Sequence, residues 1–222
     1  FQYRDDEPDA YYYLGDAYSH LAEDAVSSND YPEAKKNYEL AYDAYMHALE
    51  IDPQNWEEEV TQALKYNYNN RMFQASRDWN EKFYEQAEGH LRLAYAALPD
   101  SLTPIKSIAR MKMQMSRTPE FQSEKLAQEA LGLLDKVLES HPDAYLLRFD
   151  KANVLMALGR NDEAHAIYED LMKEHSDDTA LLIDVATLAI NEGDYERAAD
   201  LYVRIVDLRE ADTDPANDNQ NK

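Results

Sequence analysis

Cysteine is absent from this chain of 222 residues, and glycine occurs only five times. Without cysteine there is no disulfide, no thiol nucleophile and no cysteine metal site. The scarcity of glycine, beside many Ala, Leu, Glu and Tyr residues, argues against a turn-rich sheet protein and favours helices. No apolar run reaches the roughly 18 residues that a membrane span needs, so we expect no membrane insertion of this segment. Hydrophobic residues still make up 44% of the chain, which is enough for a packed core.

Positive charge is also in short supply, with 22 basic against 45 acidic residues and a formal net charge of −23. Nucleic acids and anionic membranes are therefore poor partners, because both need a basic protein surface. Two interpretations of the acidity remain. One is a solvated acidic surface adapted to high salt, and the other is an acidic face that attracts a basic partner. The acids are spread along the whole chain, which favours the first interpretation.

The usual signatures of catalysis are missing as well. None of the six histidines forms an HExxH pair, and His165 and His175 lie ten residues apart without a nearby third ligand. There is no glycine loop for phosphate and no nucleophile elbow. In so acidic a chain, runs such as Glu57-Glu58-Glu59 are chance neighbours on a wet face. We therefore expect a protein that is not an enzyme and that uses no metal and no cofactor.

What the chain does contain is an internal repeat, clearest in residues 146–176 and 180–210. Small and apolar residues recur there at a spacing of 34: Ala152 with Ala186, Gly159 with Gly193, Ala164 with Ala198, Tyr168 with Tyr202 and Leu171 with Ile205. The two glycines can end a first helix in the left-handed conformation. The alanines are small where two antiparallel helices must approach closely. One such pair cannot bury its apolar face alone, so the units must stack.

The second half of this pattern recurs upstream, as an alanine 12 residues before a closing proline. The three copies are Ala41 with Pro53, Ala87 with Pro99 and Ala130 with Pro142. On these residues the chain resembles the tetratricopeptide-repeat family from about residue 9 to residue 210. The resemblance implies an all-α fold, an α–α superhelix (solenoid) of about five helix pairs.

The early units are longer than the late ones. The step from Ala41 to Ala87 is 46 residues and the next, to Ala130, is 43, whereas the last two steps are 34 each. We expect the extra residues to lengthen helices, with one long helix or two abutting ones over 56–83, a turn at 116–119 and a helix that restarts near Glu120. The expected units are 9–53, 55–99, 102–142, 143–176 and 177–210, between an N-terminal extension at 1–8 and a disordered tail or linker at 211–222.

The resemblance also implies a binding groove, since the first helix of each pair lines the concave face in this family, where extended peptides bind. The residues assigned to it are Lys106, Arg110, Met113, Leu146, Phe149, Asn153, Met156, Ile183, Thr187 and Ile190, joined by Met72, Ser76 and Trp79 from the second unit. Ala180 and Asp184 stand where some family members carry the basic residues of a carboxylate clamp. The remaining apolar stripe suits an apolar or amphipathic segment. The alternative is that the chain's own next repeat or a second copy covers it.

Tyrosine is enriched, with 17 residues. Tyr38, Tyr42 and Tyr45 follow helical spacing and are expected mostly in the core. In contrast, Tyr11, Tyr12 and Tyr13 are consecutive and cannot all point inward. At least one of the three must meet solvent, a neighbouring chain or a ligand. Together with Trp79 they form a candidate aromatic binding surface.

These features predict a protein–protein interaction scaffold that binds a peptide or partner protein on its concave face. The alternative is a structural subunit of a larger assembly, formed by self-association or by additional repeats. The acidity is typical of a halophilic bacterium. By analogy with bacterial relatives that a lipid anchors, the periplasm or cell envelope is favoured, with the cytoplasm as the alternative.

Overall fold

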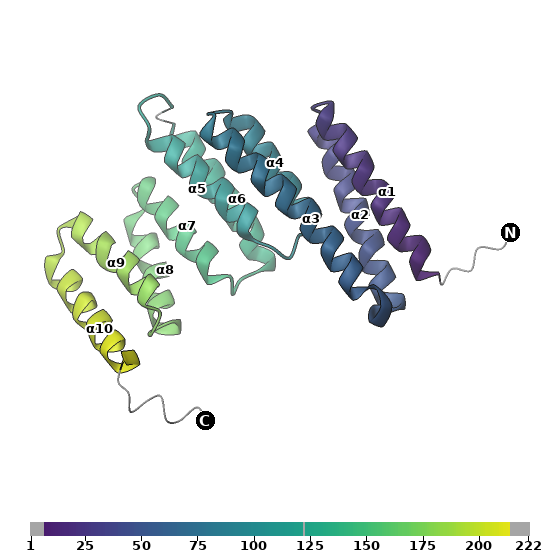
Figure 1. Cartoon of the computed structure of the whole chain (residues 1–222). Helices are drawn as coiled ribbons and strands as arrows, with labels where there is room; N and C mark the ends of the chain where they lie inside the picture. The colour runs from purple at the N-terminus through teal and green to yellow at the C-terminus, as the bar shows by residue number, and fades with distance from the viewer. Residues whose placement is uncertain (1–6, 122, 214–222) are drawn as a thin grey trace. The chain divides into compact units, whose positions relative to one another are not determined.

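The structure is a computed structural model that describes residues 7–121 and 123–213, and over these residues it contains ten α-helices and no strand (Figure 1). The chain divides into two compact units, Phe1–Thr118 and Pro119–Lys222. Over the described residues, no helix combines the length and the apolar character that crossing a membrane requires. The prediction of an all-α helical-repeat fold is confirmed.

Unit 1 contains five helices: α1 (Pro8–Ser27), α2 (Tyr31–Ile51), α3 (Pro53–Asn80), α4 (Tyr84–Ala97) and α5 (Thr103–Arg117). The helix α1 pairs with α2 and α3 pairs with α4, while α2 also contacts α3 and α4, and α5 packs on α4. The helices α1, α2 and α3 are 20, 21 and 28 residues long, whereas α7 and α8 have 13 and 14. The extra residues of the early units therefore lengthen helices.

Local sequence fixes where these helices begin. Proline occupies the first turn of α1, α2, α3 and α5, where its missing N–H is not needed. The Asp30 carboxylate accepts a hydrogen bond from the backbone N–H of Glu33 at 3.1 Å, and Asp52 caps α3 in the same way through Asn55. The long helices of unit 1 thus start at defined residues, which fixes the register of the side chains along them.

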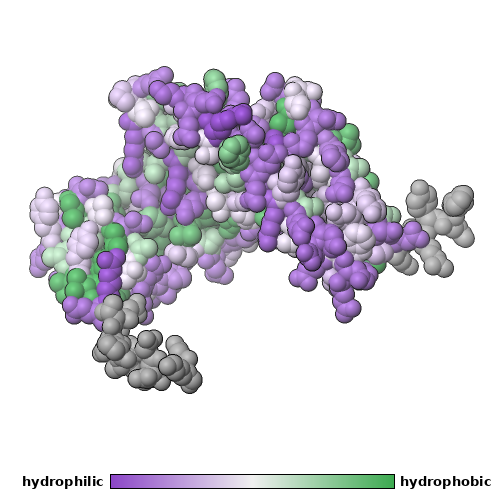
Figure 2. Space-filling model, viewed as in Figure 1, coloured by the Kyte–Doolittle hydropathy of each residue, from purple (hydrophilic) through white to green (hydrophobic). Residues whose placement is uncertain are grey.

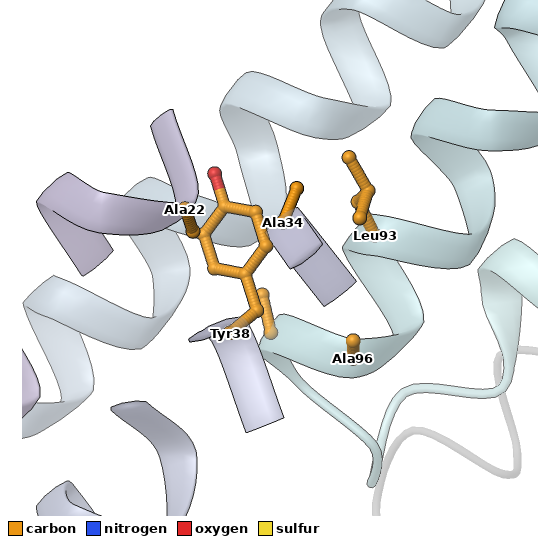
Figure 3. Packing of buried hydrophobic residues seen from close by; sticks show 6 residues of the cluster. Ala22, Ala34, Tyr38, Leu93 and Ala96 are labelled. Atoms are coloured by element: carbon orange, nitrogen blue, oxygen red, sulfur yellow. The ribbon is translucent and has the colours of Figure 1, made fainter. Parts of the chain in front are cut away.

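The core of unit 1 joins its helix pairs through one buried tyrosine. In Figure 3 the ring of Tyr38, on α2, lies between Ala22 of α1 and Ala34 of its own helix, and Leu93 and Ala96 of α4 complete the cluster. These residues are almost completely buried. The small alanines let the helices approach the ring closely. The expected core positions of Tyr38 and Tyr45 are confirmed, whereas Tyr42 is only half-buried.

Unit 2 contains α6 (Glu124–Ser140), α7 (Tyr145–Ala157), α8 (Asn161–Glu174), α9 (Thr179–Glu192) and α10 (Tyr195–Thr213). The helix α7 contacts α6 and α8, and α9 pairs with α10. Gly159 and Gly193 have φ angles of 73° and 81°, so both adopt the left-handed conformation expected where a first helix ends. Ala152, Ala164, Ala186 and Ala198 are buried where the helices of each pair approach.

Three boundaries differ in detail from the predictions. The helix α6 begins at Glu124 rather than near Glu120, because the chain from Pro119 forms a turn first and Ser123, a residue type that favours the N-cap position, precedes the helix. The long helix predicted over 56–83 is the single helix α3. The helix α10 continues to Thr213, so the first three residues of the expected tail are helical. The rest of that tail and residues 1–6 of the expected extension lie outside the described residues.

Candidate functional site

A mainly apolar groove of about 300 Å³ lies between α3, α4 and α5 of unit 1. We call it the α3–α5 groove. Its principal lining residues are Met72, Ser76 and Trp79 from α3, Leu91 from α4, and Arg110 and Met111 from α5. The ring of Trp79 stands edge-on to Tyr84 with 5.0 Å between centroids, which holds one wall in place. The groove therefore offers two flexible methionines and one fixed aromatic ring to a ligand.

Four of the residues assigned to a groove from the sequence, Met72, Ser76, Trp79 and Arg110, come together here. Lys106 and Met113 do not line it. The buried stripe of α5 runs through Ile105, Ile108 and Lys112, and the groove lies on the flank that carries Ser107, Met111 and Gln114. Residues 106 and 113 share the opposite flank of that stripe because they are seven positions apart.

The helix α5 differs in charge from the rest of the chain. From residue 101 to residue 119 there is no Asp or Glu, whereas Lys106, Arg110, Lys112 and Arg117 are basic. The Lys112 ammonium lies 2.7 Å from the Glu88 carboxylate of α4, an ion pair that ties α5 to its neighbour. The α5 wall of the groove thus carries Arg110 and Met111 and no acidic residue, in a protein with a net charge of −23.

In unit 2, two of the predicted groove residues serve the packing of α7 on α8. Phe149 is only 8% exposed and lies 5.4 Å, centroid to centroid, from the Tyr168 ring. The Asn153 amide donates to the backbone carbonyl of Phe149 at 3.2 Å and accepts from the Tyr168 hydroxyl at 3.1 Å. Both side chains are therefore committed to contacts within the helix pair.

The other predicted residues of unit 2 lie on α7 and α9. Leu146, Thr187 and Ile190 are exposed, and Met156 and Ile183 are half-buried. The hollow found in this unit has a different, polar lining that includes Asn161, His165 and Glu192. His165 Nε2 lies 2.9 Å from the Glu192 carboxylate. Over the described residues no group of three or more side chains is arranged to hold a metal ion.

The three consecutive tyrosines of α1 have three different surroundings. Tyr11 packs edge-on against His47 at 4.3 Å between centroids, and Tyr12 stacks on Trp56 at 4.7 Å. Tyr13 is 64% exposed. Tyr13 therefore meets solvent, as we expected of at least one of the three.

Sequence analysis missed a second groove, of about 410 Å³, between α1 and α3. We call it the α1–α3 groove. Tyr12 and Asp16 of α1 face Glu59 and Tyr66 of α3 across it, and Tyr45 of α2 also lines it. In a chain this acidic the carboxylates looked like solvated surface residues. No spacing signal pairs residues of α1 with residues some 45 positions later.

It also missed a buried ionic network behind this groove. The Glu23 carboxylate accepts hydrogen bonds from Arg71 Nη2, at 2.9 Å, and from the Tyr38 hydroxyl. Arg71 is almost fully buried and its Nη1 lies 3.5 Å from His90 Nδ1. On the other side of the ring, His90 Nε2 lies 3.4 Å from the Asp78 carboxylate. Charges on α1, α3 and α4 are thus linked through the interior of unit 1.

The network sets the protonation state of His90. A guanidinium can only donate, so Nδ1 is the acceptor and the neutral ring carries its hydrogen on Nε2, toward Asp78. Burial lowers the pKa of His90, and the positive charge of Arg71 lowers it further, against the opposing effect of Asp78. His90 is therefore held neutral near pH 7.

A sequence signal for this network exists along α3. Its buried positions are Val60, Leu64, Asn67, Arg71, Ala75 and Asp78, with steps of three or four residues. That spacing marks one helical stripe, which begins apolar and continues through polar side chains. Asn67, Arg71 and Asp78 could have been assigned to the interior from their place on this stripe.

A tetratricopeptide-repeat family model matches residues 121–182 and 155–217, and a second model of the same repeat matches 31–55. No curated protein matches the chain significantly. Among solved structures, MamA (AMB-1) is 18% identical with a TM-score of 0.43, and the match covers 88% of this chain and 92% of that one. PilW, a widely conserved type IV pilus biogenesis factor, is 16% identical with a TM-score of 0.47, over 89% of this chain and 78% of that one.

The two structural matches are too distant to carry an argument about this chain. The repeat matches, in contrast, together cover more than half of it. The matches at 121–182 and 155–217 contain the helix pairs whose left-handed glycines and buried alanines recur at the spacing of 34. The chain belongs to the tetratricopeptide-repeat family.

Proposed function

We propose that this protein is a non-enzymatic scaffold that binds a segment of a partner protein in the α3–α5 groove. Tetratricopeptide-repeat proteins are in general protein–protein interaction scaffolds, which sets the class of function. The observation that carries the proposal is the groove itself, in which Met72, Trp79, Leu91 and Met111 form a mainly apolar lining. A hollow of this size and lining suits one or two large apolar side chains.

The charge around the α3–α5 groove indicates which kind of partner segment it binds. The stretch that supplies one wall, residues 101–119, has four basic residues and no acidic one, and Arg110 lines the groove itself. A basic side chain beside an apolar hollow, in a stretch without acidic residues, favours a segment in which leucine, isoleucine, methionine or phenylalanine stands next to Asp or Glu. The methionines can adapt their shape to more than one such side chain.

Selection from a random peptide display library tests the proposal. Peptides selected on the wild-type chain are measured again on Ser76→Arg, which places a long side chain at an exposed position of the groove. The control is Asn69→Arg, which makes a change of similar size and charge at an exposed position of α3 about two turns away and outside the groove lining.

We expect the selected peptides to pair apolar with acidic residues, to lose at least about tenfold in affinity for Ser76→Arg, and to keep their affinity for Asn69→Arg. Peptides without acidic residues would contradict the charge argument. Equal binding to both variants would contradict the α3–α5 groove as the site.

One observation favours the alternative, a structural subunit that associates with further copies. Tyr195, Tyr202, Val203 and Val206 of α10 are exposed, and Figure 2 shows apolar side chains over the part of unit 2 that contains α9 and α10. Light scattering across a range of concentrations tests it. Association that Val206→Glu abolishes would support this role, and a wild-type chain that stays monomeric would remove it.

A further inference from the structure

The α1–α3 groove carries uncompensated negative charge. Among the acidic residues that line it, Glu23 is neutralised by Arg71 at 2.9 Å. Asp16 accepts a hydrogen bond from the neutral Tyr45 hydroxyl at 2.7 Å, and no described residue forms an ion pair with it. Glu59 has no ion pair with any described residue, and neither Lys nor Arg lines this groove. Two carboxylates, one from each helix, are therefore left without a counter-charge.

The negative charges of Asp16 and Glu59 act inside the same groove. Tyr12 also lines the groove, and its pKa is raised by burial and then by the negative charges of Asp16 and Glu59. Because the two acids belong to helices on opposite sides of the groove, their fields add inside it rather than along one solvated helix face. The groove between α1 and α3 therefore favours the binding of a positive charge.

Aromatic rings complete the site. Tyr12 is fixed by stacking on Trp56, with 4.7 Å between centroids and 29° between ring planes. Tyr66 of α3 is 68% exposed although it lines the groove, so most of its side chain is accessible to a ligand. An aromatic face beside carboxylates suits a guanidinium, which stacks on the ring and donates hydrogen bonds to the carboxylates at the same time.

We propose that the α1–α3 groove binds an arginine side chain from a basic segment of a partner protein. Carboxylates from α1 and α3 supply the charge, and the ring of Tyr66 supplies the stacking surface. The groove is lined by residues 12–67, whereas the α3–α5 groove is lined by residues 72–114. The helix α3 thus contributes its first half to one site and its second half to the other, and the two can be tested separately.

The experiment is an NMR titration of the ¹⁵N-labelled full chain at low ionic strength. The probe is the peptide acetyl-Gly-Gly-Arg-Gly-Gly-amide, and its control replaces arginine by citrulline, which has nearly the same shape without the charge. We expect the arginine peptide to shift amide resonances of residues 12–23 and 59–67, and the citrulline peptide to leave them in place. Equal shifts with citrulline, or shifts centred elsewhere, would overturn the proposal.

Variants separate this site from general attraction to an acidic protein. Glu59→Gln and Tyr66→Leu should each weaken binding about two- to fivefold, the size of a single exposed ion pair or cation–π contact. Two matched controls, Glu57→Gln on the same helix and Tyr195→Leu on α10, should bind as the wild type does. Equal weakening by Glu59→Gln and Glu57→Gln would show that the peptide senses only net charge, and equal weakening by Tyr66→Leu and Tyr195→Leu would show that the Tyr66 ring has no special role. Either result would contradict a built site.

The variant Ser76→Arg distinguishes this inference from the proposed function. It obstructs the α3–α5 groove and should leave the arginine-dependent shifts of residues 12–23 unchanged. Loss of those shifts in Ser76→Arg would place the peptide in the other groove and overturn the assignment to α1 and α3.

Discussion

The ring of Tyr45 lies against the backbone of Gly15, so close that a Cβ atom on residue 15 would come within 2.6 Å of two ring carbons. Tyr45 is buried, and its hydroxyl donates to Asp16 Oδ1 at 2.7 Å, so the ring cannot withdraw without losing that hydrogen bond. Gly15 thus sets the distance between α1 and α2, although glycine is unfavourable inside a helix.

Replacement of Gly15 by alanine should destabilise unit 1 by about 1–2 kcal/mol. Overpacking costs about 1–3 kcal/mol, and a 2.6 Å contact with a ring that cannot withdraw belongs in the upper half of that range. The better helix propensity of alanine offsets about 1 kcal/mol of this cost. Both tryptophans, Trp56 and Trp79, lie in unit 1, so tryptophan fluorescence during urea unfolding reports on this unit. A stability equal to or above that of the wild type would show that α1 and α2 leave enough space for a methyl group at residue 15.

Gly132→Ala is the opposite case. Gly132 lies inside α6, and a Cβ atom there would meet nothing within 4 Å. Alanine should therefore stabilise unit 2 by about 0.5–1 kcal/mol through helix propensity alone. Amide hydrogen exchange of α6 measures the change, since unit 2 contains no tryptophan. Faster exchange in the variant than in the wild type would contradict the open surroundings of this residue.

Glu23→Gln tests the buried network. Glutamine has nearly the same shape and can still accept from Tyr38, but it leaves the buried Arg71 guanidinium without its counter-charge. We expect a loss of about 1–3 kcal/mol in the free energy of unfolding of unit 1, less than for a fully buried pair because Glu23 is one-third exposed. Adding Arg71→Met to this variant should cost less than it does in the wild type. Simple additivity of the two losses would show that Glu23 and Arg71 do not stabilise each other.

The network also predicts a pH dependence. An unfolded histidine has a pKa of about 6.5, and the pKa of folded His90 is lowered by burial and by Arg71, so the unfolded chain takes up the proton first as the pH falls. The contribution of His90 to stability is complete above about pH 6.5 and is lost as the pH drops below it, by at most about 1.4 kcal/mol per pH unit. Urea unfolding followed by tryptophan fluorescence measures this between about pH 7.5 and pH 5.5.

The matched variant for this measurement is His90→Gln, which cannot titrate in that range. Its free energy of unfolding should vary less with pH than that of the wild type. The same slope in both proteins would assign the acid sensitivity of unit 1 to other groups, such as its many carboxylates.

The C-terminal repeats could be predicted closely because their signals are local. Each glycine, Gly159 or Gly193, sits at fixed offsets from the alanines of its own helix pair, and the structure places the glycines in the left-handed conformation and the alanines in the interior. The lengthened early helices could be predicted for the same reason, since Tyr38 and Tyr45 continue one helical stripe. The start of α6 was predicted four residues too early, because the sequence after Pro119 does not show where the turn ends.

The candidate sites were harder to predict from the sequence, because they depend on how each helix is rotated about its own axis relative to its neighbour. Arg110 lines the α3–α5 groove, whereas Lys106 and Met113, which the sequence groups with it, lie on the other flank of α5. Phe149 and Asn153 were assigned to a surface, whereas the structure commits both to Tyr168. The α1–α3 groove joins residues that are distant in sequence, and no local pattern could bring Asp16 and Glu59 together.

Hydrogen–deuterium exchange of the wild-type chain, with and without a display-selected peptide, tests the central claim most directly. If the α3–α5 groove is the binding site, exchange slows in the second half of α3 and in α5, and Ser76→Arg shows no such slowing. Protection confined to α9 and α10, or no protection anywhere at saturating peptide, would contradict the claim that this scaffold binds its partner in the α3–α5 groove.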